Sequence, residues 1–159
     1  MVYQDTYNIE QILQKMQRYC AYQERCHQEV EHKLRSYPLT KNARDEILLK
    51  LLEDNFLNEE RYAKAYVSGK FKIKKWGKNR LKAELKKRNI SSYNIKNALS
   101  QIDQTTYEAS FYQLALKRYK QLENIKAVSE KKKKFADYLF YRGWESQLVG
   151  DAIRKLFKP

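Results

Sequence analysis

The sequence predicts an all-α protein made of three tandem three-helix repeats that form an elongated, curved array. Only 4 Gly and 2 Pro occur in 159 residues, too few turn residues for an all-β chain. Apolar residues separated by 4, 5, 5 and 4 positions occur twice. The two copies are Leu81, Leu85, Ile90, Ile95 and Leu99, and Phe135, Leu139, Trp144, Val149 and Ile153. Such self-similarity is typical of stacked helical units, which bury their apolar faces against one another.

A weaker third copy lies earlier in the chain. It opens with Val30, Leu34 and Leu39 and closes with Leu48, but its middle position holds Arg44. The three copies lie 51 and 54 residues apart and divide the chain into three repeats. We expect these repeats to span residues 1–57, 58–104 and 105–159.

The first repeat is predicted to contain three helices. Ile9, Ile12, Leu13, Met16 and Tyr19 follow helical spacing and define the first. The second carries Val30 and Leu34 and ends before Pro38, because the residue before a proline disfavours the α region. The third runs from Thr40, a suitable N-cap, to about Asp54.

The second repeat begins at Asn58, which can cap a helix whose first turn holds two glutamates. A basic connection between Gly69 and Gly77 leads to a helix over about 78–88. Asn89 then accepts the left-handed conformation that often ends a helix. Ser91 or Ser92 can cap the helix that follows.

The third repeat repeats this plan. A longer helix is expected from about Thr106, and Lys131 to Lys134 start the next. Gly143 is expected to end its helix in the left-handed conformation, as Asn89 does in the second repeat, and the last helix is expected to begin near Glu145.

Charge is distributed unevenly along the chain. The net charge is +14, but residues 1–60 carry −3 and residues 61–159 carry +17. A basic region of this size favours a polyanionic partner such as nucleic acid, an acidic protein surface or an anionic membrane. The alternative is that the lysines only solvate helix faces, as they do in many lysine-rich proteins.

Recognisable catalytic and cofactor motifs are missing from the sequence. There is no Walker or GxGxxG phosphate loop, no HExxH and no CxxC, so we expect no enzyme, no cofactor and no metal site. Cys20 and Cys26 are expected to be free thiols. The polar N-terminus and the lack of a long apolar run predict a cytoplasmic protein that does not enter a membrane. We expect a monomer.

The strongest functional signal lies at residues 64–88, where 11 Lys and Arg accompany one acid, Glu84. Lysines recur every four residues at 74, 78, 82 and 86, which on one helix forms a stripe able to follow a phosphate backbone. Trp76 either packs between repeats, the interpretation we favour, or stacks on a base. A second basic run, Lys131 to Lys134, opposes the dipole at a helix start. The candidate binding residues are Lys72, Lys74, Lys75, Lys78, Arg80, Lys82, Lys86, Lys87, Lys131, Lys132, Lys133 and Lys134.

These motifs resemble a known family. The segments Asn58-Glu59-Glu60-Arg61-Tyr62-Ala63 and Trp76-Gly77-Lys78-Asn79-Arg80-Leu81-Lys82-Ala83-Glu84-Leu85-Lys86-Lys87-Arg88-Asn89-Ile90 resemble the central signature of the bacterial RecX regulatory proteins. The resemblance is strongest over 58–99, good over 130–156 and weak before residue 55. Asn89 stands where the family usually has Gly, and lysine replaces many of its arginines, which preserves phosphate attraction but reduces bidentate contacts.

The resemblance implies a non-enzymatic regulator of the RecA recombinase. Such proteins bind the RecA filament on single-stranded DNA, lie along its groove and suppress recombinase, ATPase and coprotease activity in DNA repair and the SOS response. Two other functions remain compatible with the residues. One is a general helical module that binds nucleic acid without a recombinase, and the other is a protein-interaction scaffold whose acidic and basic parts bind separate proteins.

Overall fold

The computed structural model describes the backbone of residues 3–158 and the side chains of residues 9–158. Residues 1–2 of the first predicted repeat and residue 159 of the third lie outside the described residues. The described part of the chain is entirely helical and contains no strand. Its elements are α1 Tyr3–Tyr22, α2 His27–Leu34, α3 Lys41–Glu53, α4 Glu59–Gly69, the π-helix η1 Lys70–Lys74, α5 Lys78–Lys87, α6 Ser92–Ser100, α7 Gln104–Gln121, α8 Val128–Tyr141 and α9 Ser146–Leu156. None of the helices within residues 3–158 is long and apolar enough to span a membrane.

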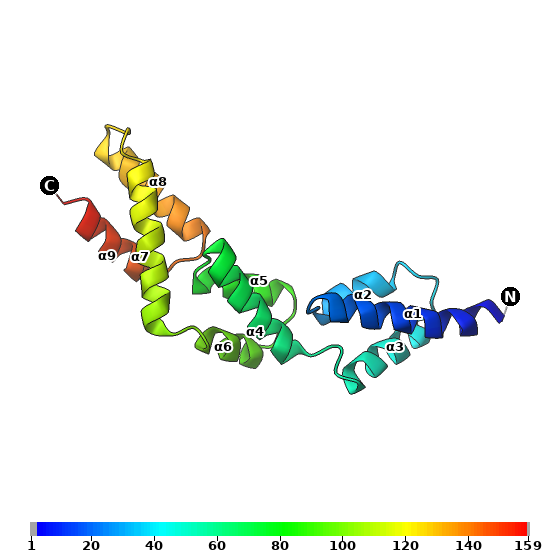
Figure 1. The fold of residues 1–159 in the computed structure, drawn as a ribbon. Coiled ribbons are helices and arrows are strands. Elements are labelled where there is room, and N and C mark those ends of the chain that lie inside the picture. Colours follow the sequence, from blue (N-terminus) through cyan, green and yellow to red (C-terminus); the bar gives the residue numbers. More distant parts are fainter. Residues whose placement is uncertain (1–2, 159) are drawn as a thin grey trace.

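The helices form three successive groups of three along an elongated, curved molecule (Figure 1). Helices α1 and α2 pack on α3, α4 and α5 pack on α6, and α7 and α8 pack on α9. The N-terminal end lies at one extreme of the array and the C-terminal group at the other (Figure 1). The all-α prediction and the tandem three-helix plan are confirmed.

The apolar repeat explains why the second and third groups look alike. The first four positions of each copy are buried, from Leu81 to Ile95 and from Phe135 to Val149. The turn between the two helices needs a left-handed residue in both, and Asn89 and Gly143 supply it with φ of 59° and 91°. Equal spacing along the chain therefore produces the same buried positions and the same turn.

The first group departs from this plan at the position the sequence marked as irregular. Arg44 is only half-buried, and its guanidinium donates to the Leu39 carbonyl at 2.9 Å. The preceding residue, Ala43, and then Ile47 and Leu51 face the core instead. The core-facing stripe of α3 is thus shifted by one residue relative to the other two groups.

Side chains cap the starts of α3, α4, α6 and α7. Thr40, Asn58 and Ser91 each accept a hydrogen bond from the backbone N–H three residues further on, as the sequence predicts. Helix α7 begins two residues earlier than expected, because the Asp103 carboxylate rather than Thr106 provides the cap and accepts the Thr106 amide at 3.1 Å.

The two junctions between groups differ in chemistry. Buried residues of the second and third groups form one continuous hydrophobic core, which Cys26 of the first group joins, whereas the other buried residues of the first group form a core of their own. The first junction is largely polar. Arg61 pairs with Glu24 at 2.5 Å, and the Tyr62 hydroxyl donates to Glu29 at 2.9 Å. Because Coulomb pairs are screened by water and salt more than apolar burial is, we expect this junction to be the weaker one.

The second junction is formed by close contact between two backbone segments. The Gly77 amide donates to the Arg142 carbonyl at 2.8 Å, and the Asn79 amide donates to Gly143 at 3.0 Å. A Cβ on Gly77 would lie 2.5 Å from the Gly143 oxygen, so only glycine fits there. The α8–α9 turn thus receives amides from the first turn of α5, which has no side-chain cap.

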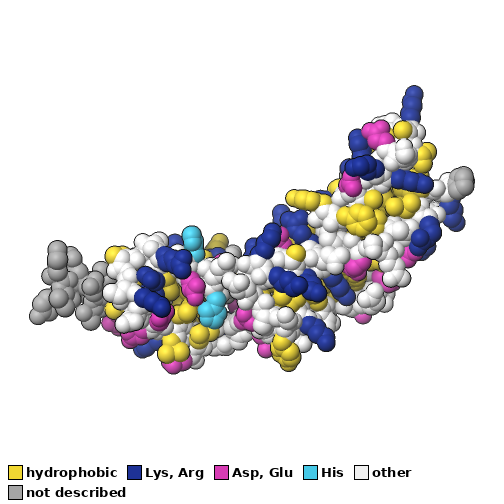
Figure 2. All heavy atoms as spheres, turned by 180° about the vertical axis from the view of Figure 1, so that it is seen from behind, with side chains coloured by type: hydrophobic (Ala, Val, Ile, Leu, Met, Phe, Trp, Pro, Cys, Tyr) yellow, Lys and Arg dark blue, Asp and Glu magenta, His cyan; other side chains and the backbone are white. Residues whose placement is uncertain are grey.

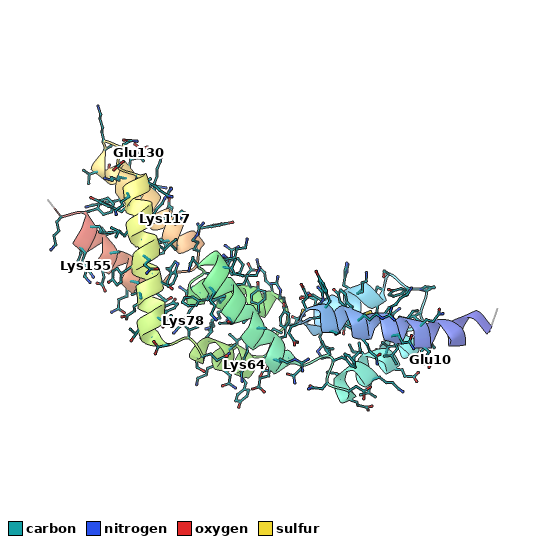
Figure 3. The ribbon with its side chains drawn as sticks, viewed as in Figure 1. Glu10, Lys64, Lys78, Lys117, Glu130 and Lys155 are labelled. Atoms are coloured by element: carbon teal, nitrogen blue, oxygen red, sulfur yellow. The ribbon has the colours of Figure 1, made fainter. Side chains whose placement is uncertain are left out.

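A hydrogen-bonded chain completes this junction. The Lys78 amide donates to the Tyr107 hydroxyl at 2.8 Å, and that hydroxyl donates to the Glu145 carboxylate. Burial, above all, raises the pKa of the Tyr107 hydroxyl far above its usual value, and the hydrogen bond to Glu145 raises it further. The hydroxyl therefore stays protonated. The Trp144 indole also donates to the Lys75 carbonyl at 3.1 Å. Helices α5, α7, α8 and α9 are therefore joined at one point, where Figure 3 shows Lys78 beside α7.

Candidate partner-binding surface

Exposed lysines of the second group form the main basic feature, which we call the lysine face. It consists of Lys82 and Lys86 on α5 together with Lys96 on α6, and all three are exposed. They line one cleft of about 320 Å³ between the two helices. Among the described side chains of residues 9–158, none of the three pairs with a carboxylate. Their ammonium groups are available to an external anion.

Lys96 was missed in the sequence because it lies outside the four-residue series. Its place is set by the Ser91 cap, which starts α6 so that Ile95 faces the core and Lys96 lies beside it at the surface. Folding the two helices against each other then brings Lys96 to Lys82 and Lys86. The signal that could have identified Lys96 is its position directly after Ile95, a predicted core residue of the helix that packs against the lysine series.

The four-residue series does not form one continuous helical stripe. Lys74 belongs to the π-helix η1, and Lys75 follows in the left-handed conformation with φ of 58°, which ends that helix. Only Lys78, Lys82 and Lys86 share α5, where they turn through about 80°. Lys72, Lys74 and Lys75 are exposed on a separate basic turn beside the second junction. The predicted stripe is thus divided into two neighbouring parts.

The arginines of this region and Lys87 form ion pairs within the chain. Glu84 accepts from Arg80 at 3.2 Å and from Arg88 at 3.1 Å, and it lies 3.6 Å from Lys87. Desolvation alone would raise the pKa of Glu84, but the hydrogen bond from Arg88 and the charges of Lys87 and Arg80 outweigh it and lower the pKa. Arg80 also donates to the Tyr141 carbonyl at 3.0 Å and so connects α5 to the third group. The external charge of this surface is therefore carried by lysines.

The second basic run does not start its helix. Helix α8 begins at Val128, so Lys131 to Lys134 are its fourth to seventh residues, and the expected conflict with the dipole at the helix start is wrong. Lys133 pairs with Asp137 at 2.8 Å and Lys134 with Glu130 at 3.3 Å. Lys131 lies over the Tyr119 ring at 4.6 Å. Only Lys132 of the four has no ion pair or ring contact within the described part of the chain.

Trp76 packs against the core, which is the interpretation that we favour from the sequence. It is half-buried and packs against the continuous core of the second and third groups. The guanidinium of Arg80 lies 4.5 Å from its ring and the ammonium of Lys70 lies 5.3 Å away. Its packing role is thus established, while part of the ring remains at the basic surface.

Neither cysteine offers a reactive thiol. Cys20 and Cys26 are free and buried, and burial raises the pKa of both thiols. A thiol that stays protonated at neutral pH is a poor nucleophile.

The arrangement is suited to binding an extended polyanion. Figure 2 shows Lys and Arg side chains over the second and third groups, interspersed with hydrophobic side chains on the same face. Flexible lysines attract phosphates or carboxylates as point charges and read no base sequence. The fold and surface define a protein of tandem three-helix repeats that presents an elongated basic surface.

Comparisons with known proteins agree with this class. Residues 58–99 match the family model described as "RecX, second three-helix domain". The chain is 32% identical over 105 residues to the regulatory protein RecX of Clostridioides difficile strain 630, an alignment that covers 64% of this chain and 48% of that protein. It is 24% identical over 138 residues to the RecX of Bacillus cytotoxicus, covering 87% of this chain and 51% of that protein. The chain belongs to the RecX family.

The same fold occurs in solved structures. The crystal structure of RecX from Lactobacillus salivarius superposes with a TM-score of 0.80 at 24% identity, over 96% of this chain and 98% of that one. A second crystal structure, of a regulatory protein RecX, gives a TM-score of 0.78 at 22% identity and covers 90% of this chain and 71% of that one. The chain spans about half the length of the curated relatives it matches.

Proposed function

We propose that this chain regulates a RecA recombinase by binding the filament that RecA forms on single-stranded DNA, and that it inhibits recombination, ATPase and coprotease activity without being an enzyme. The observation that carries the proposal is the lysine face, whose three ammonium groups have no ion-pair partner among the described side chains. Family membership supplies the class of partner.

The shape of the chain supports this partner. An elongated array of repeats can contact successive subunits of a filament, which a small compact domain cannot do. The continuous core and the backbone contacts at the second junction hold the lysine face in a fixed position relative to the third group. Charges held on a stiff scaffold lose less entropy on binding than charges on a mobile tail.

The test reverses the charge of the lysine face. Lys82, Lys86 and Lys96 are changed to Glu together, and inhibition of RecA strand exchange is measured beside binding to the filament. A matched control reverses Lys117, Lys120 and Lys126, which are also exposed but belong to the third group. It imposes the same change in net charge, so nonspecific loss of attraction affects both variants equally.

We expect the lysine-face variant to lose inhibition and the control to keep most of it. If the lysines contact phosphates, the slope of log affinity against log salt becomes shallower by about 2, since each phosphate contact on a single strand contributes about 0.7. Equal inhibition by the two variants would contradict the assignment of the site. Binding to bare nucleic acid that recombinase leaves unchanged would favour the general nucleic-acid module instead.

A further inference from the structure

Four side chains from both sides of the second junction form a row, in which a guanidinium lies between two aromatic rings. The guanidinium of Arg80 lies 4.5 Å from the Trp76 ring centroid and 4.9 Å from that of Tyr141. Behind Trp76, the Tyr66 ring follows at 6.4 Å. The order Tyr66, Trp76, Arg80, Tyr141 is called the junction stack below.

The outer end of the junction stack is open to solvent. Tyr141 is 71% exposed although Arg80 lies over its ring, so most of that ring contributes nothing to the core. Its neighbour Phe140 is also exposed, at 48%. Tyr141 therefore presents an exposed aromatic ring that lies against a fixed cation.

Hydrogen bonds hold the Arg80 guanidinium in place within this stack. Its Nε pairs with Glu84 and its Nη1 donates to the Tyr141 carbonyl, so the guanidinium is fixed between the two rings. A ring held in place in this way loses little freedom when a planar ligand stacks on it.

Two exposed lysines directly precede Trp76 in the chain. Lys74 and Lys75 are exposed and form no ion pair with the side chains described between residues 9 and 158. The Lys75 carbonyl accepts the Trp144 indole, which places this lysine at the same junction. Lys75 also holds a left-handed backbone conformation, which is strained for a residue with a Cβ.

We infer that the junction stack is a base-stacking site for single-stranded nucleic acid, with Tyr141 contacting a base and Lys74 and Lys75 contacting the adjacent phosphates. The inference rests on the proposed function and deepens it. The lysine face supplies attraction to phosphate or carboxylate alone, whereas the junction stack distinguishes a strand that has bases from an anion that lacks them. Stacking on an aromatic ring tolerates any base, which suits a protein that binds without sequence preference.

The experiment compares two probes of equal charge. An oligothymidine and an abasic strand of the same length are titrated against the full chain, with strand anisotropy as the main readout. Quenching of tryptophan fluorescence is a second readout, because Trp144 is buried and Trp76 lies within the stack. We expect the oligothymidine to bind about tenfold more tightly, which corresponds to one stacked base.

The variants isolate the ring. Tyr141→Ala should abolish the preference for oligothymidine and leave the salt slope unchanged, and Tyr141→Phe should retain the preference. Tyr93→Ala is the matched control, since Tyr93 is 72% exposed but lies on α6 outside the stack. Because both tyrosines are at the surface, neither variant should lose helicity.

Each outcome decides the inference. Equal affinity of the wild-type chain for the two strands, or no binding to either, would overturn the junction stack as a base-binding site. An equal effect of Tyr141→Ala and Tyr93→Ala would overturn it too. The proposed function is judged separately, by RecA inhibition with the wild-type chain, so one can fail while the other holds.

Discussion

Replacing Gly77 with alanine is the sharpest test of the second junction. The new Cβ would lie 2.5 Å from the Gly143 oxygen, 2.6 Å from its carbonyl carbon and 2.7 Å from the Trp144 Cα. These are backbone atoms, so the clash is relieved only by moving α5 away from the α8–α9 turn. The backbone of Gly77 itself, with φ of −81°, accepts alanine without strain. The effect is therefore purely one of close approach.

The magnitude follows from the contacts that the movement breaks. Two backbone hydrogen bonds, from Gly77 to Arg142 and from Asn79 to Gly143, are worth about 0.5 to 1.5 kcal/mol each. Overpacking of a tight site costs a further 1 to 3 kcal/mol or so. The free energy of unfolding should fall by roughly 2 to 6 kcal/mol, which lowers the melting temperature by about 4 to 24 °C in a chain of this size.

Thermal unfolding followed by far-ultraviolet circular dichroism measures this change. Gly69→Ala is the control, since a Cβ at this helical glycine meets nothing within 4 Å. It should raise stability by about 0.5 to 1 kcal/mol, because alanine favours a helix interior more than glycine does. If Gly77→Ala melts within about 2 °C of the wild type, the junction is not formed by this backbone contact and the reasoning fails.

Two further substitutions test local electrostatics and backbone strain. Glu84→Gln should lower the melting temperature at pH 7. The pKa of Glu84 is lowered in the folded state, so the charge of Glu84 stabilises the fold above the unfolded-state pKa of about 4.3. This stabilisation is lost as pH falls through the lowered pKa of the folded state, so the melting temperatures of the variant and the wild type should converge in acid. A difference that stays constant with pH would contradict the ion cluster. Lys75→Gly should raise the free energy of unfolding, measured by urea titration, by about 0.5 to 1 kcal/mol. Glycine relieves the strain of the left-handed backbone, but it also adds conformational freedom to the unfolded chain, which offsets part of that gain. It should also weaken strand binding, and unchanged affinity would show that Lys75 is not used for its charge.

The fold could be predicted from local features of the sequence. The apolar spacing specified the buried positions of the second and third groups, and Thr40, Asn58 and Ser91 marked helix starts through their own caps. Asn89 was recognised as a left-handed residue because its chemistry allows that conformation. Each of these features depends on residues a few positions apart.

The surface was less predictable because distant residues determine it. Whether Lys74 continues the stripe depends on the break at Lys75, whose carbonyl is bonded by Trp144, 69 residues away. Arg80 was grouped with the lysines, but it contacts Tyr141, 61 residues further on. Of the run Lys131 to Lys134, the last two lysines pair with Asp137 and Glu130 in the helix. Sequence spacing shows where charges lie, and only packing shows which remain free.

Regulation of RecA is tested by titrating this chain into RecA of the same organism on single-stranded DNA and measuring ATP hydrolysis and strand exchange. We expect inhibition of both activities at well below one molecule per RecA subunit, since an elongated array that contacts successive subunits acts on the filament rather than on single protomers. Unchanged activities up to equimolar amounts, with binding to bare DNA at the same salt concentration, would contradict it.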